Sequence, residues 1–139
     1  MFLIIRGFSA CRVPLLTLTE SNPMSSLIVE QTAVAGLLLL RPKCFRDDRG
    51  FYVETWNRQV MASVALAYDF VQDNHSLSRD VGTIRGLHFQ APPHAQDKLV
   101  RCTRGAILDV AVDIRVGSPT FGNWVSVELT AENGHQLLI

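Results

Sequence analysis

His88 is well suited to proton transfer, because an imidazole titrates close to neutral pH. It lies in the segment Arg-Gly-Leu-His-Phe-Gln, residues 85–90, with an apolar residue on each side. A lone histidine in this setting is more often a hydrogen-bonded core residue than a catalyst. Lys98 and Arg101 follow in Lys-Leu-Val-Arg. Cationic donors of this kind can stabilise an oxygen on which negative charge develops, although such a pair usually marks two ends of a solvated strand.

Two further polar clusters have ordinary structural explanations when they are taken singly. Residues 47–50, Asp-Asp-Arg-Gly, are typical of a turn, because Asp and Gly adopt the backbone conformations that turns require. Residues 72–76, Gln-Asp-Asn-His-Ser, would by default end a strand with local side-chain caps. Each cluster alone predicts a local structure and no activity.

The histidine spacing argues against a metal site. His88 is followed by Phe89 and Gln90, and the next histidine, His94, lies in the proline-rich loop 91–97. Imidazole ligands have to converge on one point, and this spacing does not predict such a focus. We therefore expect no metal ion.

The elements that would position these side chains are short strands. Runs rich in Val, Ile, Phe, Tyr and Trp alternate with Gly, Pro, Asn and Asp, which is typical of an antiparallel sandwich or barrel. The expected strands are 37–40, 51–56, 70–74, 83–90, 98–104, 106–114, 124–130 and 136–139. Arg58 to Ala67 is expected to form a short helix with Asn57 as its cap.

Two details predict where side chains face. Alternation along residues 107–113 places Asp109 and Asp113 on one face and aliphatic residues on the other. That face is either a solvated side or, if the sheet curls into a barrel, the lining of a pocket. Gly86 predicts a bulge within its strand, and a bulge would bring Arg85 and His88 to the same side.

Composition excludes some classes of partner. Lys+Arg and Asp+Glu each number 13 in the 139 residues, which argues against a general nucleic-acid or membrane-surface binder. No apolar run reaches the roughly 18–20 residues that a transmembrane helix needs. The three cysteines, Cys11, Cys44 and Cys102, are far apart and predict neither a disulfide framework nor a metal pair, which favours the cytoplasm.

Residues 1–23 are interpreted as a disordered or mis-assigned extension, and residues 24–139 as one domain.

The polar segments acquire a different meaning as an ordered set. Residues 48–54, 72–76, 85–90, 98–101, 109–113 and 118–122 occur in one order that closely resembles the dTDP-4-dehydrorhamnose 3,5-epimerase family of dTDP-L-rhamnose synthesis. The resemblance runs from about Leu27 to Ile139. Each short motif is weak, whereas six in the same order and with nearly the same spacing are specific.

The resemblance implies an all-β, cupin-like jelly-roll barrel with one short helix, a homodimer, and no metal or organic cofactor. It also implies a dTDP-sugar substrate, whose rhamnose product would serve a lipopolysaccharide or cell-wall polysaccharide. In such proteins the residue matching His88 is the base that removes protons beside the sugar ketone. The residues matching Lys98 and Arg85 lie around the keto oxygen and the sugar.

The same resemblance implies roles for five further residues. Those matching Gln72 and Asn74 contact the nucleotide, and the one matching Asp109 faces the same pocket. Those matching Arg49 and Glu54 reach the nucleotide of the neighbouring subunit. For the diphosphate, bidentate arginine suits better than lysine. Arg49 and Arg101 are the candidates, and only Arg49 is supported by the resemblance.

The family pattern continues beyond Ile139 with a tyrosine acid and with the carboxylate that orients the catalytic histidine. We therefore expect a barrel that is incomplete at its C-terminus, with one sheet edge left open after the final strand. Two alternatives remain open: a related sugar-nucleotide epimerase or ketoisomerase, and an inactive sugar-nucleotide-binding remnant.

Overall fold

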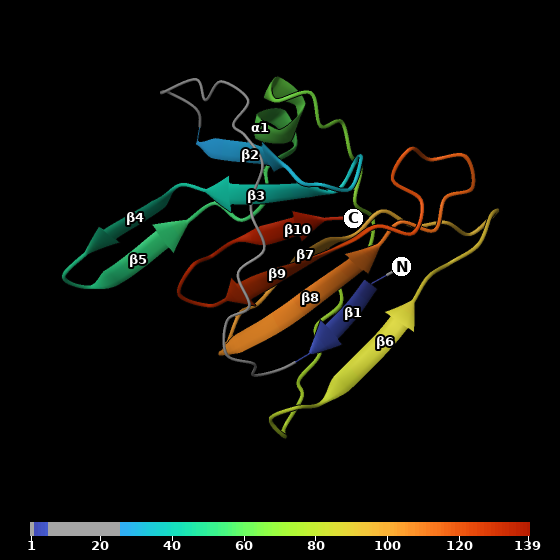
Figure 1. Ribbon diagram of the computed structural model, residues 1–139. Helices are drawn as coiled ribbons and strands as arrows, with labels where there is room; N and C mark the ends of the chain where they lie inside the picture. Colours follow the sequence, from blue (N-terminus) through green and yellow to red (C-terminus); the bar gives the residue numbers. More distant parts are fainter. Residues whose placement is uncertain (1, 6–25) are drawn as a thin grey trace.

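Two four-stranded antiparallel sheets and a separate two-stranded hairpin make up the fold (Figure 1). The computed structural model describes residues 2–5 and 26–139. Its first sheet has the order β6-β1-β8-β9, its second has the order β2-β3-β10-β7, and β4-β5 form the hairpin. The elements are β1 (Phe2–Ile5), β2 (Leu27–Gln31), β3 (Leu38–Pro42), β4 (Cys44–Asp47), β5 (Gly50–Val53), α1 (Arg58–Ser63), β6 (Ile84–His88), β7 (Leu99–Arg101), β8 (Ala106–Val112), β9 (Trp124–Thr130) and β10 (Gln136–Leu138). The expected all-β architecture with one short helix is confirmed.

The final strand does not lie at an edge. β10 pairs with β3 on one side and with β7 on the other, so this strand is not itself an open edge. Leu137 and Leu138 are 0% and 1% exposed, and such residues are best buried in the centre of a sheet. The outer strands of the described sheets are β6, β9, β2 and β7.

The N-terminal residues contribute a strand. Residues 2–5, which we expected to belong to an extension, form β1 between β6 and β8 in the first sheet (Figure 1). The other residues of the predicted extension lie outside the described part of the chain. Neighbouring backbone groups on both sides allow a short strand to form here, although its own sequence has no alternating pattern.

The two middle strands of the second sheet, β3 and β10, are covered on both faces, which explains their leucine runs. Leu39 and Leu137 pack with Ala111, Val125 and Leu129 of the first sheet in the core between the sheets. On the other face, a second cluster is centred on α1. Its buried members are Leu27, Leu38, Leu40, Met61 and Leu138. A strand covered on both faces is apolar at every position and shows no alternation.

Asn57 caps α1 as the sequence predicts. Its side-chain oxygen accepts hydrogen bonds from the backbone nitrogens of Gln59 (2.9 Å) and Val60 (3.2 Å). The helix ends at Ser63, four residues before the expected end at Ala67. Ala65 has a φ of 62°, and a residue in this left-handed conformation terminates a helix.

Replacing Asn57 with alanine is expected to lower the free energy of unfolding by about 1 kcal/mol, because two backbone donors of the first helical turn lose their acceptor. Urea denaturation measures this loss. Asn57→Ser is the matched control, since its hydroxyl still accepts a hydrogen bond. An equal loss in both variants would show that capping is not the cause.

Three segments differ from the expected strands. Residues 70–74 form no strand, because they have no continuous apolar face: Val71 is 91% exposed, while Gln72 and Asn74 hydrogen-bond to each other. The strand β4 was not predicted, since all four of its residues are exposed and give no burial pattern. The strand β2 was also missed.

Among the residues that the structure describes, no helix is long and apolar enough to cross a membrane.

Candidate active site

A large open cavity is bordered by the segment that follows α1 and by residues 95–104, which include β7. Its volume is about 1300 Å³, above the roughly 300–1,000 Å³ of typical small-molecule sites. Gln72, Asn74, Arg85 and Lys98 line it together. Four of the eight predicted site residues, which come from three separate parts of the sequence, therefore meet at one cavity.

The polar side chains of this cavity are held by local hydrogen bonds. Arg85 donates from Nε to Oγ of Ser78 (2.9 Å) and from Nη2 to the carbonyl oxygen of Leu77 (3.2 Å). Nε2 of Gln72 donates to Oδ1 of Asn74 (3.0 Å). Segment 72–78 thus fixes the guanidinium of Arg85 beside the amides that we expect to contact a nucleotide.

Lys98 is half-buried at the start of β7. Its backbone nitrogen and oxygen pair with those of Ile139 at 2.8 and 2.9 Å, which extends the ladder between β7 and β10. Partial burial lowers the pKa of the Lys98 amine below its ordinary value, because desolvation disfavours the charged form. The amine is therefore anchored by its backbone and directed toward the cavity that it lines.

The bulge predicted at Gly86 is present. Phe2 pairs with His88, whereas the next residue, Leu3, pairs with Gly86, so β6 has one extra residue at this point. Residues directly opposite each other share a face of the sheet, and Ile4 pairs with Arg85. The register consequently places Arg85 and His88 on one face, as the sequence predicts.

Asp109 shares that face and is fully buried. Phe2 and Ile4 pair on their other side with Ala111 and Asp109, and Asp109 has 0% of its surface exposed. Neither carboxylate oxygen has a hydrogen-bond partner within residues 26–139. Burial raises the pKa of Asp109 to about 7, because the charged form is poorly solvated there. The face that carries Asp109 is therefore not solvated, and Asp109 does not line the large cavity.

Asp113 follows β8 and is also buried, but its carboxylate is fully engaged. It accepts hydrogen bonds from Arg115, Ser118 and Thr120. The Arg115 guanidinium holds the pKa of Asp113 well below its usual range. This residue closes the loop between β8 and β9 and does not line the large cavity.

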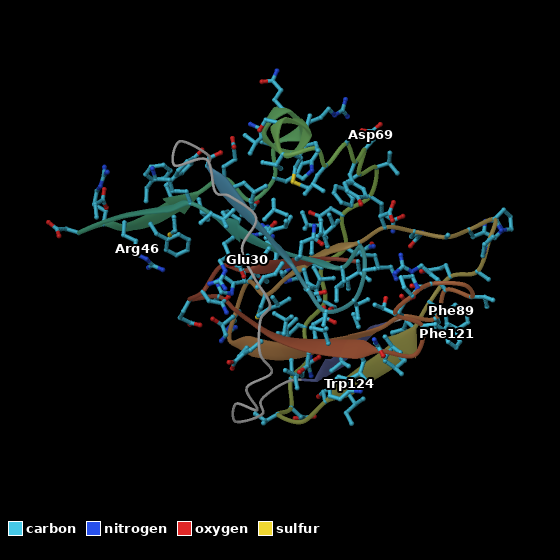
Figure 2. The ribbon with its side chains drawn as sticks, turned by 45° about the horizontal axis from the view of Figure 1, so that its top comes forward. Glu30, Arg46, Asp69, Phe89, Phe121 and Trp124 are labelled. Carbon is cyan, nitrogen blue, oxygen red and sulfur yellow. The ribbon has the colours of Figure 1, made fainter. Side chains whose placement is uncertain are left out.

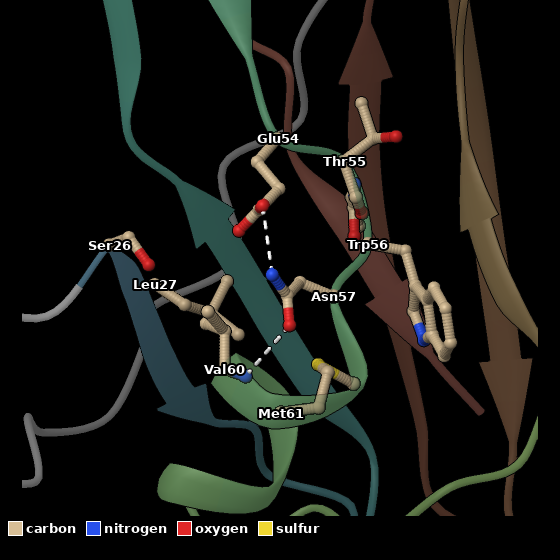
Figure 3. Close-up of a pocket in the computed structure, with 9 residues that line it drawn as sticks. Ser26, Leu27, Glu54, Thr55, Trp56, Asn57, Val60 and Met61 are labelled. Atoms are coloured by element: carbon tan, nitrogen blue, oxygen red, sulfur yellow. Dashed lines mark hydrogen bonds between the residues drawn. The ribbon is translucent and has the colours of Figure 1, made fainter.

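His88, Arg49, Glu54 and Asp109 do not line the large cavity. Arg49 lies at the turn of the β4-β5 hairpin, where its guanidinium donates to Asp47 and lowers the pKa of that carboxyl. Glu54 lies beside α1, and its Oε1 accepts from Nδ2 of Asn57 at 2.9 Å (Figure 3). The recess at this place has a volume of only about 10 Å³, which is roughly room for one water molecule.

The cavity is also lined by basic side chains to which the family resemblance assigned no role. Arg101 and Arg104 line it together with Arg85 and Lys98, against the carboxylates Asp69, Asp73 and Asp97. Asp69 lies on the segment that follows α1 (Figure 2). Its carboxylate is paired with Arg58, which does not line the cavity. The lining therefore favours an anionic ligand. Arg104 was not predicted, because a Thr-Arg-Gly turn is a common loop sequence.

Aromatic rings border the same cavity. Tyr68 and Phe70 stack at a centroid distance of 5.8 Å, and Trp56 meets Phe70 edge-on at 6.5 Å. In the part of the chain that the structure describes, no group of three or more His, Cys, Asp or Glu side chains has the arrangement of a metal site.

Comparison with known proteins supports the resemblance to the dTDP-4-dehydrorhamnose 3,5-epimerase family. The sequence profile described as dTDP-4-dehydrorhamnose 3,5-epimerase matches residues 31–139. The dTDP-4-dehydrorhamnose 3,5-epimerase of Sinorhizobium fredii is 52% identical over 120 residues, which cover 84% of this chain and 60% of that protein. This chain therefore spans about three fifths of the length of that relative.

Solved structures of dTDP-sugar epimerases are similar to this chain. The dTDP-4-dehydrorhamnose 3,5-epimerase of Bacillus anthracis, with TDP and PPi bound, superposes with a TM-score of 0.79 at 48% identity, covering 81% of this chain and 65% of that one. The dTDP-6-deoxy-D-glucose-3,5-epimerase of Legionella pneumophila, in complex with dTDP-4-keto-L-rhamnose, gives 0.75 at 43% identity, covering 81% and 60%. The two sheets are those of a cupin-like jelly roll, and the chain belongs to the dTDP-4-dehydrorhamnose 3,5-epimerase family.

Proposed function

We propose that this chain binds a dTDP-sugar in the large cavity and removes protons beside the C4 ketone of dTDP-4-dehydro-6-deoxyglucose. The reaction would be the 3,5-epimerisation of dTDP-L-rhamnose synthesis, carried out in the cytoplasm. The observation that carries the proposal is the meeting of Gln72, Asn74, Arg85 and Lys98 at one cavity. The identity of 52% to a 3,5-epimerase favours this reaction over a related epimerase or ketoisomerase.

Epimerisation beside a ketone requires a base and a group that stabilises the enolate. A ketone α-proton is less acidic than imidazolium by about ten pKa units, which corresponds to roughly 14 kcal/mol. His88 takes the α-proton. The electron pair of the broken C–H bond forms a C=C bond to C4, and the π electron pair of the C4 ketone moves to its oxygen. The base cannot supply the whole difference, so stabilisation of the oxyanion must supply the rest. The cationic Lys98 and Arg85 are the groups for that role.

The nucleotide part of the substrate would lie along the segment 68–78. Gln72 and Asn74 present amides there, which can donate to and accept from a pyrimidine base or a ribose. Arg101 and Arg104 supply charge for the diphosphate, and arginine is the side chain that binds such oxygens in pairs.

A homodimer is part of this proposal. Arg49 and Glu54 do not line the cavity of their own chain, and the β4-β5 hairpin that carries Arg49 projects from the body of the molecule (Figure 1). Phe45, Phe51 and Tyr52 on this hairpin are 53%, 60% and 69% exposed. A partner subunit would cover these rings and receive Arg49 and Glu54 at its nucleotide.

Replacing Arg101 with glutamine is expected to weaken dTDP binding about tenfold, because a charge-assisted hydrogen bond contributes roughly 1.5–3 kcal/mol and Arg101 is partly solvated. Titration calorimetry gives the dissociation constant. Thymidine is the matched ligand control, since it lacks the phosphates, and its affinity, followed by NMR, should stay unchanged. If the parent chain is folded and shows no binding to dTDP at millimolar concentration, the proposed function is wrong.

A further inference from the structure

Gln136 is a polar residue in surroundings that are otherwise apolar. It begins the strand β10, Gln-Leu-Leu, and only 2% of its surface is exposed. Its backbone pairs with Leu40 of β3 and with Arg101 of β7, and residues directly opposite each other share a face of the sheet. The side chain of Gln136 therefore lies on the face where Leu40 and Leu138 pack with Met61 of α1.

The buried amide of Gln136 has an acceptor far away in the sequence. Its Nε2 donates a hydrogen bond of 2.7 Å to the backbone oxygen of Thr55. An amide buried without a partner destabilises a fold, so this bond explains how the amide is tolerated. Thr55 lies in residues 54–57, the connecting segment between β5 and α1, which has no regular secondary structure. The amide thus fixes the backbone of a segment that neither a strand nor a helix holds.

Trp56 links the connecting segment with the proposed nucleotide-binding segment. Its indole points away from Asn57 (Figure 3) and lines the large cavity. The indole meets the ring of Phe70 edge-on at 6.5 Å, and Phe70 stacks on Tyr68 at 5.8 Å. Both rings lie in residues 68–78, along which we expect the nucleotide to bind. Trp56 therefore packs against the start of that segment.

We propose that Gln136 is a positioning residue of the site, whose buried amide holds the connecting segment so that Trp56 supports residues 68–78. Gln136 does not itself line the large cavity, so it acts through Thr55 and Trp56. When the hydrogen bond is lost, the carbonyl group of Thr55 turns freely and the indole loses its fixed place. This inference rests on the proposed function, because it assigns a role within the site of that function.

The first test compares Gln136→Met with Leu138→Met in the absence of ligand. Methionine is as long as glutamine but has no N–H donor. In NMR spectra of Gln136→Met the indole signal of Trp56 should shift, whereas that of the exposed Trp124 on β9 should not. Leu138 lies on the same face of the same strand, so Leu138→Met is the matched control and should leave both indole signals in place.

The second test measures ligand binding by the same variants. Gln136→Met should raise the dissociation constants of thymidine and of dTDP by the same factor, about fivefold, because a segment that is not held beforehand has to be ordered when the nucleoside binds. The substitution Arg101→Gln, in contrast, is expected to weaken dTDP alone. Weaker binding of dTDP without weaker binding of thymidine in Gln136→Met would overturn the inference, because the effect would then pass through the neighbouring Arg101.

The other outcomes are equally decisive. An unchanged indole signal of Trp56, or unchanged affinity for both ligands, would overturn the inference. Equal effects in Leu138→Met would also overturn it, because lost packing would then be the cause. If the parent chain binds no dTDP, the proposed function is wrong, and the indole signal of the ligand-free protein still decides whether Gln136 orients the connecting segment.

The unmodified protein gives a test that does not depend on the folding of a variant. The side-chain amide protons of Gln136 should exchange with solvent at least about tenfold more slowly than those of Gln59, because a buried, hydrogen-bonded amide is protected. Gln59 is exposed on α1 and is the internal reference. If both side chains exchange at the same rate, the hydrogen bond to Thr55 does not hold in solution and the inference is wrong.

Discussion

Replacing His88 with alanine is expected to abolish the exchange of the C3 and C5 hydrogens of dTDP-4-dehydro-6-deoxyglucose that the proposed function predicts for the parent chain in D₂O. A positioned general base contributes about 100- to 10,000-fold to a rate, and the imidazole is the base of the proposed reaction. NMR follows the loss of the two proton signals and the configuration of both carbons in one sample.

His94→Ala is the matched control for this substitution. His94 is exposed in the loop between β6 and β7 and has no role in the proposed reaction, so this variant should exchange at the parent rate. Exchange in His88→Ala as fast as in the parent would show that another residue is the base. The resemblance places the tyrosine acid beyond Ile139, so a protein of residues 1–139 should retain configuration. Net epimerisation by it would point to an acid within these residues, and Tyr68 lines the cavity.

Replacing Asp109 with asparagine is expected to make the protein more stable than the parent above neutral pH and to remove part of its pH dependence. Burial raises the pKa of Asp109 from 3.8 to about 7 in the folded protein. The folded state therefore binds the proton more tightly than the unfolded chain does. The associated stability is complete below about pH 4 and is lost as pH rises through about 7.

The measurement is the difference in unfolding free energy between Asp109→Asn and the parent, from urea titrations between pH 4 and 8. This difference should rise by at most about 4 kcal/mol over the range, since one pKa unit corresponds to about 1.36 kcal/mol. Asp80→Asn, which removes one exposed carboxylate, is the matched control. A constant difference across the range would mean that Asp109 ionises in the folded protein as readily as in the unfolded chain.

Local sequence signals were sufficient where a residue acts on its own backbone. Asn57 caps α1 because its side chain reaches donors two and three residues away. Gly86 predicts a bulge, and the register of β6 contains one. The strand expected at 124–130 is β9 with the same bounds, because its residues alternate and one face is buried.

Signals failed where a segment takes its conformation from distant residues. Residues 70–74 have the composition of a strand, but none of the described strands pairs with them, and their amides face the cavity. The hairpin strand β4 has no buried residue, so its partner β5 decides its conformation. β1 is the clearest case, because only the gap between β6 and β8 gives four apolar residues a place in a sheet.

The features of the candidate site also divide into those that the sequence determined and those that the tertiary structure decided. The sequence by itself determined which residue types are present, their order, the family that this order resembles, and the face shared by Arg85 and His88. Only the tertiary structure decided that Gln72, Asn74, Arg85, Lys98 and Arg101 meet at one cavity, that Glu54 turns to Asn57 instead, and that Asp109 is buried without a hydrogen-bond partner in residues 26–139. The physical reason is that burial and cavities arise from contacts between segments far apart in the chain, whereas caps, turns and bulges arise from neighbours within a few residues.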